Sequence, residues 1–179
     1  MREEHRRLLE AWRINDRITT FLVERIPPAL WTAALPASPR RTVRSIGAHL
    51  HNTRCNWLKS LAAGAGVAVP ARVDRASATP TAVATALRRS DEQILLMLQA
   101  GFDNGGDFPG VSSAFVWGAI PRNVPLFVAY AVSHEAHHRG QVLLMARELG
   151  QRLPREVVAG LWQWSSRRKE AGPEGASGA

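Results

Sequence analysis

The amino-acid sequence predicts an all-α protein: an antiparallel four-helix bundle with a short extra helix near the C-terminus. Four long segments carry apolar residues at the spacing of three and four that marks one face of a helix. Proline and glycine residues stand at the ends of those segments. No segment alternates apolar and polar residues as a half-buried strand does. Long amphipathic helices bury their apolar faces most simply against one another, in a bundle.

The first two helices are predicted over residues 3–25 and 42–63. Pro27 and Pro28 end the first helix, because proline lacks the amide hydrogen that continues the hydrogen-bond ladder. A proline-rich loop over residues 27–39 follows, and a glycine marks the end of the second helix.

The third helix is predicted over residues 80–100, after a connection of glycine, alanine, valine and proline at 64–78. Thr79 supplies a capping hydroxyl, and Pro80 occupies the first helical position, where its missing amide hydrogen costs nothing. We expect the helix to stop at Gly101.

A glycine-rich linker over residues 101–122 precedes the fourth helix, which is predicted over 123–149. The linker is longer than most loops in compact domains, which indicates a functional or packing role, and a short hairpin would fit in it. Leu153 and Pro154 open the short fifth helix. Its apolar residues are Val157, Leu161, Trp162 and Trp164.

The chain of 179 residues is long enough for one domain with a real core, predicted over residues 1–169. The glycine, serine, alanine and proline of residues 170–179 predict a disordered tail. The one cysteine, Cys55, excludes an internal disulfide, and we expect it to be a packed helix residue rather than a nucleophile.

The sequence also limits where the protein works. No apolar run reaches the roughly 18 residues that a membrane span needs, so we expect no membrane partner. The N-terminus shows an amphipathic pattern instead of the apolar region of a signal peptide, so we expect a cytoplasmic location.

The net charge of +8 comes almost entirely from arginine. A nucleic-acid-binding protein gathers its basic residues on one face or in one run. Here they are scattered in pairs, so we expect a small-molecule substrate and no nucleic acid. The pairs are Arg6-Arg7, Arg40-Arg41, Arg88-Arg89 and Arg167-Arg168.

Three of the six histidines fall within the fourth predicted helix. His134 and His138 are one turn apart and differ by only about 40° around the helix axis, so both can hold one cation. They belong to the apolar, core-facing side of the helix. A pair of His134 and His137 is the weaker alternative.

A metal site needs a third ligand, which in a bundle comes from a facing helix. The second helix offers His49 and His51. His49 shares a face with apolar Ile46, whereas His51 lies about 200° away around the axis. We therefore expect His49 to point inward and His51 to point outward or to support a ligand. Three imidazoles suit Zn²⁺, Ni²⁺ and Fe²⁺ almost equally.

The chain resembles the DinB/YfiT-like superfamily of metal-dependent helical bundles, over nearly its whole length except the tail. Five stretches carry the resemblance: Thr42-Val43-Arg44-Ser45-Ile46-Gly47-Ala48-His49-Leu50-His51-Asn52-Thr53-Arg54, Trp57-Leu58-Lys59, His134-Glu135-Ala136-His137-His138-Arg139-Gly140-Gln141, Met145-Ala146-Arg147 and Leu161-Trp162-Gln163-Trp164.

The resemblance implies an up-down-down-up bundle and frequent homodimers. It also implies a divalent metal held by His49, His134 and His138, and we expect Zn²⁺ or Ni²⁺ rather than Fe²⁺. Relatives use low-molecular-weight thiols: some transfer a thiol to an electrophile, and another isomerises maleylpyruvate with mycothiol. We therefore expect a metal-dependent enzyme of the thiol S-transferase type that acts on a small electrophile. No catalytic residue beyond the metal ligands is identified.

Four further residues are candidates for supporting the ligands or lining the cleft: His51, His137, Arg139 and Gln141. Arg139 either orients the site or a bound anion, or forms a salt bridge between helices. Gln141, close to one turn beyond His138, is placed to hydrogen-bond a ligand. Gly140 is expected to permit close approach of a neighbouring helix.

Two alternatives remain. His134, Glu135 and His138 also satisfy the H-E-x-x-H pattern of zinc peptidases, with the glutamate as general base. No third histidine follows at the metzincin spacing, and no strand-rich part is present to bind a peptide. The other alternative is a non-catalytic bundle, stabilised by metal, that acts as a scaffold or stress-response binding protein. A vacant coordination position that faces an open cleft would favour catalysis instead.

Overall fold

The computed structural model describes residues 2–110 and 120–172. These residues form helices and isolated bridges and no strand, which confirms the all-α class. The helices are α1 (Glu3–Glu24), α2 (Pro28–Trp31), α3 (Val43–Leu61), α4 (Pro80–Asp103), α5 (Val124–Glu148), α6 (Arg155–Gly160) and α7 (Trp164–Glu170).

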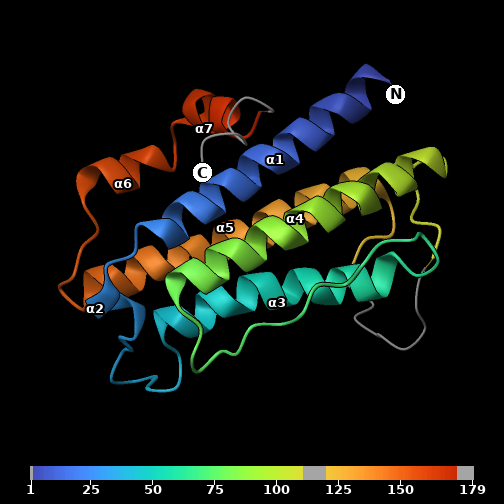
Figure 1. The fold of residues 1–179 in the computed structure, drawn as a ribbon. Coiled ribbons are helices and arrows are strands. Elements are labelled where there is room, and N and C mark those ends of the chain that lie inside the picture. The colour runs from blue at the N-terminus through green and yellow to red at the C-terminus, as the bar shows by residue number, and fades with distance from the viewer. Residues whose placement is uncertain (1, 111–119, 173–179) are drawn as a thin grey trace.

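The four long helices α1, α3, α4 and α5 lie side by side (Figure 1). In this view α1 and α5 run in one direction, and α3 and α4 run in the other. The short helices α6 and α7 lie outside this group, and α7 packs on α1. No helix in the described part of the chain has both the length and the apolar character needed to cross a membrane.

Two threonines fix the starts of α3 and α4, and of these the sequence predicted the cap at Thr79. The Thr42 hydroxyl accepts a hydrogen bond from the Ser45 amide at 3.0 Å. The Thr79 hydroxyl accepts one from the Ala82 amide at 3.1 Å, and Pro80 follows it as the first helical residue. Each cap satisfies an amide that the helix itself leaves without a partner.

Packing changes three of the predicted boundaries. The helix predicted to stop at Gly101 continues to Asp103. Gly101 is buried against the start of α5, where an added Cβ would lie 2.4 Å from Val124 Cγ2, so this glycine serves close packing and does not end the helix. The proline-rich loop contains the short α2, and the fifth predicted helix is divided into α6 and α7.

The C-terminal end is only partly described. Glu170, assigned to the predicted disordered tail, ends α7 and forms ion pairs with Arg17 and Arg167. Residues 173–179 lie outside the described residues, and so do residues 111–119 of the linker in which a short hairpin would fit.

A layer of buried polar residues crosses the middle of the bundle and divides the core into two apolar clusters. One cluster includes Leu30, Leu50 and Leu87, and the other includes Trp12, Trp57 and Phe127. On each long helix the polar positions fall between residues of the two clusters. This polar layer consists of Asn15, Asp16, Arg54, Ser90 and Glu135.

Candidate metal centre

The structure brings three histidines together at the level of the polar layer. His49 comes from α3, and His134 and His138 come from consecutive turns of α5. Each offers a ring nitrogen that lies within 4.8 Å of the nitrogens of the other two. His134 Nε2 and His138 Nε2 are 3.2 Å apart. Two nitrogens bound at about 2.0–2.1 Å to one tetrahedral ion are separated by about 3.3 Å, so these residues fit a metal.

Aromatic packing holds the rings in this arrangement. The His134 ring lies 5.4 Å from the Trp57 ring and 6.2 Å from the Tyr130 ring, measured between centroids. His49 meets His138 edge-on at 4.6 Å. His134 Nδ1 is buried and has no hydrogen-bond partner among the described residues, so no contact at this nitrogen orients the ring.

Gln141 orients the third ring. Its side-chain oxygen Oε1 lies 2.9 Å from His138 Nδ1 and accepts a hydrogen bond from it. A neutral imidazole that donates from Nδ1 carries its free lone pair on Nε2, the nitrogen that faces His134. The same Oε1 accepts a hydrogen bond from Arg41 Nη2 at 2.6 Å. Gln141 therefore connects a ligand candidate to an arginine at the surface.

The three rings are held in the neutral form that binds metals. Burial lowers the pKa of His49 and of His134 to about 4, and the neighbouring His138 contributes to both shifts. Burial also lowers the pKa of His138. Arg75 and Arg41 lower the pKa of His49 further. At neutral pH each imidazole therefore keeps a lone pair available for a cation.

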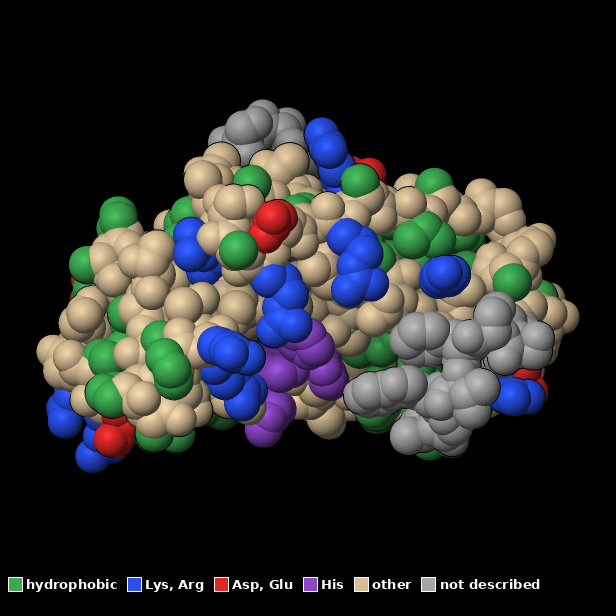
Figure 2. Space-filling view, turned by 90° about the horizontal axis from the view of Figure 1, so that it is seen from below, with side chains coloured by type: hydrophobic (Ala, Val, Ile, Leu, Met, Phe, Trp, Pro, Cys, Tyr) green, Lys and Arg blue, Asp and Glu red, His purple; other side chains and the backbone are tan. Residues whose placement is uncertain are grey.

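An open pocket of about 620 Å³ leads to two of these histidines. On the surface, the histidine side chains emerge between arginine side chains (Figure 2). We call this cavity the histidine pocket. It is lined by Ser38, Pro39, Arg40, Arg41, Ser45, Ile46, His49, Arg75 and His138.

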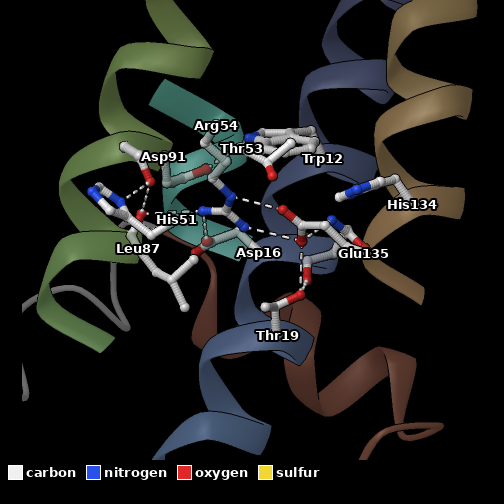
Figure 3. A network of polar contacts seen from close by, with 12 residues as sticks. Trp12, Asp16, Thr19, His51, Thr53, Arg54, Leu87, Asp91, His134 and Glu135 are labelled. Carbon is white, nitrogen blue, oxygen red and sulfur yellow. Dashed lines mark hydrogen bonds and ion pairs between the residues drawn. The ribbon is translucent and has the colours of Figure 1, made fainter. Parts of the chain in front are cut away.

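Glu135 stands between two of the candidate ligands in the sequence but turns away from the histidine pocket. Its buried carboxylate accepts hydrogen bonds from Arg54 Nε at 2.7 Å and Arg54 Nη2 at 3.0 Å (Figure 3). Asn15 Nδ2 and the Thr19 hydroxyl donate to Oε2 at 2.9 and 2.8 Å. The carboxylate is saturated with donors, so it cannot serve as the general base that the H-E-x-x-H pattern requires.

Arg54 is the centre of the polar layer and is fully buried. It also donates to Asp16 Oδ1 at 2.6 Å and to the Leu87 carbonyl at 3.1 Å. Burial opposes the charge of Arg54, but Glu135 and Asp16 outweigh it and raise its pKa. Burial alone would likewise raise the pKa of Glu135, but Arg54 lowers it. Arg54 and Glu135 are therefore both charged. The ion pairs of Arg54 with Asp16 and with Glu135 link α3 to α1 and to α5.

The sequence predicted that His51 points outward or supports a ligand, and the outward position is wrong. Its side chain is fully buried on the opposite side of α3 from His49. His51 Nε2 lies 2.9 Å from the Ala71 carbonyl, and Nδ1 lies 3.2 Å from the Ser90 hydroxyl. Packing of α4 and of the connection before it covers this face of α3. Cys55 is buried beside His51, and burial raises the pKa of its thiol, as expected for a packed residue.

None of the remaining candidates lines the histidine pocket. His137 is exposed and accepts a hydrogen bond from Gln141 Nε2 at 2.6 Å. Arg139 points to α1, where Nη1 donates to Asn15 Oδ1 at 2.9 Å and to the Thr19 hydroxyl at 2.6 Å. It therefore connects helices and does not line the histidine pocket. The expectation for Gly140 is wrong, because an added Cβ there would meet nothing within 4 Å.

Sequence reasoning missed the arginines of the histidine pocket. Arg40 and Arg41 belong to the segment before α3, and Arg75 belongs to the connection before α4. Helical periodicity gives no information on the orientation of loop side chains. The arginine pairs are scattered along the sequence, so the sequence did not indicate that three arginines lie together. The available signal was the position of Arg40-Arg41 two residues before the helix that carries His49.

Comparison with known families identifies the family of the chain. A model of the DinB family matches residues 1–166 of the chain. No significant match was found among curated proteins or among solved structures. The family match includes all four long helices and every candidate ligand. The chain therefore belongs to the DinB family.

Proposed function

We propose that the protein is a divalent-metal-dependent enzyme of the thiol S-transferase type that acts on a small electrophile. The observation that carries this proposal is that His49 and His138 line an open pocket. A structural zinc site is closed by four protein ligands, whereas a catalytic site keeps one position for water or substrate. A three-histidine cluster that opens to a pocket favours catalysis over a scaffold role.

The chain supplies the ligands and their orientation. His49, His134 and His138 would hold the ion, a donor set that suits Zn²⁺, Ni²⁺ and Fe²⁺ almost equally, and we expect Zn²⁺ or Ni²⁺ rather than Fe²⁺ from the resemblance to the family. Gln141 fixes the ring of His138. When bound, the metal supplies a Lewis acid that lowers the pKa of a coordinated thiol, so that a thiolate nucleophile exists at neutral pH.

The nucleophile in this proposal is a low-molecular-weight thiol from solution. Cys55, the one cysteine of the chain, is buried in α3 beside His51, and its raised pKa disfavours the thiolate. In the transfer, the sulfur of the thiol forms a bond to the electrophilic carbon and displaces its leaving group, which is chloride in monochlorobimane. The leaving group and the proton of the thiol both go to solvent. The pocket volume of about 620 Å³ is in the range of small-molecule sites.

The experiment is a fluorescence assay with a panel of low-molecular-weight thiols and monochlorobimane as the electrophile, run with the metal-free protein and after addition of Zn²⁺, Ni²⁺ or Fe²⁺. We expect metal-dependent turnover with at least one thiol. The His138→Ala variant should lose it, while His137→Ala, an exposed histidine on the same helix, should keep it. Absence of metal-dependent turnover with every thiol would contradict the proposal.

A further inference from the structure

The histidine pocket gathers three arginines without any carboxylate to balance them. Arg40, Arg41 and Arg75 line it, and none of its lining residues is acidic. None of the three arginines forms an ion pair with a carboxylate of the described residues. Some other surface arginines are paired, for example Arg88 with Glu24, so what distinguishes these three is that they line one pocket.

One of these arginines is held in position beside the histidines. Arg41 Nη2 donates to Gln141 Oε1, the atom that also accepts from His138. A guanidinium has five N–H donors in a rigid fork, and the Arg41 side chain makes no other hydrogen bond with the described residues. Its remaining donors are therefore available to a ligand in the pocket, and the contact with Gln141 reduces the entropy lost when that ligand binds.

The charge of the pocket indicates what kind of ligand it takes. The three guanidinium groups contribute +3, and no lining residue is negative. A divalent ion on the histidines would add to this excess of positive charge. A neutral or cationic substrate would leave that excess uncompensated. Guanidinium groups pair bidentately with carboxylate and phosphate groups.

We infer that the histidine pocket binds a small molecule with at least two negatively charged oxygen groups, carboxylate or phosphate, through Arg40, Arg41 and Arg75. The inference rests on the proposed function in that this anion is the substrate or the thiol that reaches the metal. The arginines lie around one concave pocket of about 620 Å³, which suits a small ligand better than a long polyanion.

Isothermal titration tests this with succinate and inorganic phosphate as probes, and with acetate and succinamide as the singly charged and neutral references. The metal-free and the Zn²⁺-loaded protein are titrated at constant ionic strength. We expect succinate, phosphate or both to bind at least about tenfold more tightly than acetate, and succinamide not to bind. Preference for succinate or for phosphate decides which oxyanion the pocket takes.

Substitutions locate the binding. Arg41→Gln and Arg75→Gln should each weaken binding of the preferred probe about tenfold. The control is Arg89→Gln, which removes the same charge from an exposed arginine of α4 that lines a different pocket beside His51. Binding no tighter than that of acetate, or equal loss in all three variants, would overturn the inference.

These titrations need neither thiol nor turnover, so they fail independently of the proposed function. Thiol transfer in a protein that binds no dianion would leave the proposed function in place and remove the inference. Dianion binding without any thiol transfer would do the reverse. Because a divalent ion adds positive charge beside the arginines, we also expect the dianion to bind more tightly to the Zn²⁺-loaded than to the metal-free protein.

Discussion

At the scale of single residues, the candidate metal centre depends on one hydrogen bond as well as on its three imidazoles. His138 donates from Nδ1 to Gln141 Oε1, and this bond determines which nitrogen faces the other two histidines. The ring of His134 has no such partner among the described residues and is oriented by aromatic neighbours. Substitutions at this scale should separate residues that support the metal from those that only lie nearby.

Gln141→Leu should weaken Zn²⁺ binding by about 10- to 100-fold, because His138 loses the acceptor that orients it. Competition with a chromophoric chelator measures this affinity. His137→Ala is the matched control, since it removes the contact of Gln141 Nε2 while leaving the contacts of Oε1 with His138 and Arg41 in place. Equal affinity in Gln141→Leu and the unaltered protein would show that the hydrogen bond does not matter.

His51→Ala should lower the free energy of unfolding by about 1–3 kcal/mol, because it leaves buried polar groups without a partner. Metal retention should not change, since His51 faces α4 and the connection before it. Urea denaturation gives the free energy, and elemental analysis gives the metal content. Loss of metal from a variant that still folds would return His51 to the list of ligands.

Helical spacing was enough to predict that the three histidines lie together, but it did not predict the orientation of their neighbours. His134 and His138 were identified because residues four apart share one face of a helix, and His49 because it shares a face with Ile46. The same reasoning assigned His51 to solvent, because spacing alone does not reveal that a second neighbour covers the far side of α3. The pocket arginines belong to loops, where no period exists.

At the scale of helices, the polar layer is what joins α1, α3 and α5. Arg54 of α3 reaches Asp16 on α1 and Glu135 on α5, and all of these groups are buried. Because Glu135 is next to His134 in the chain, the same contact fixes the rotation of α5 about its axis. The layer therefore directs His134 and His138 toward α3 and keeps Glu135 away from them.

Arg54→Met should lower the free energy of unfolding by about 3–5 kcal/mol, because Asp16 and Glu135 would remain as buried carboxylates without their partner. Urea denaturation measures the change. Arg88→Met is the control, since it breaks an exposed ion pair with Glu24 and should cost less than about 1 kcal/mol. Similar small losses in the two variants would contradict the role given to the polar layer.

The four long helices could be predicted from apolar periodicity and from their caps, whereas tertiary packing decided the rest. Thr42 and Thr79 mark helix starts by a local hydrogen bond that depends only on neighbouring residues. Gly101 is different, because a glycine that ends a helix and a glycine that admits another helix look alike in the sequence. The short α2 also escaped prediction, since it depends on the burial of Trp31 against the Ala78 carbonyl.

At the scale of the whole molecule, the buried histidines make stability depend on pH. The pKa of His49 and of His134 is about 4 in the folded protein, against an ordinary value of 6.5. Between these values the unfolded chain binds more protons than the folded one, so acid favours unfolding. The stability that these two neutral rings contribute is fully present above about pH 6.5, and it is lost as the pH falls toward 4. Raised pKa values at Asp16 and Asp91 act in the opposite direction.

A pair of variants isolates the histidine contribution. In the metal-free protein, the urea midpoint should decrease as the pH is lowered from 7 to 4. The decrease should be smaller in the double variant His49→Gln, His134→Gln, which retains Asp16 and Asp91. Denaturation curves across this pH range, recorded with a chelator present, measure both slopes. Identical slopes would show that the two rings are not held in the neutral form.

The central claim is that His49, His134 and His138 together hold a divalent metal, and metal content tests it most directly. Elemental analysis is performed on protein purified without a nickel column and dialysed against metal-free buffer. We expect about one equivalent of divalent metal per chain in the unaltered protein and in His137→Ala, and little in His49→Ala, His134→Ala or His138→Ala. Metal content unchanged by loss of His49 would contradict the claim, because the site would then not require the helix that faces α5.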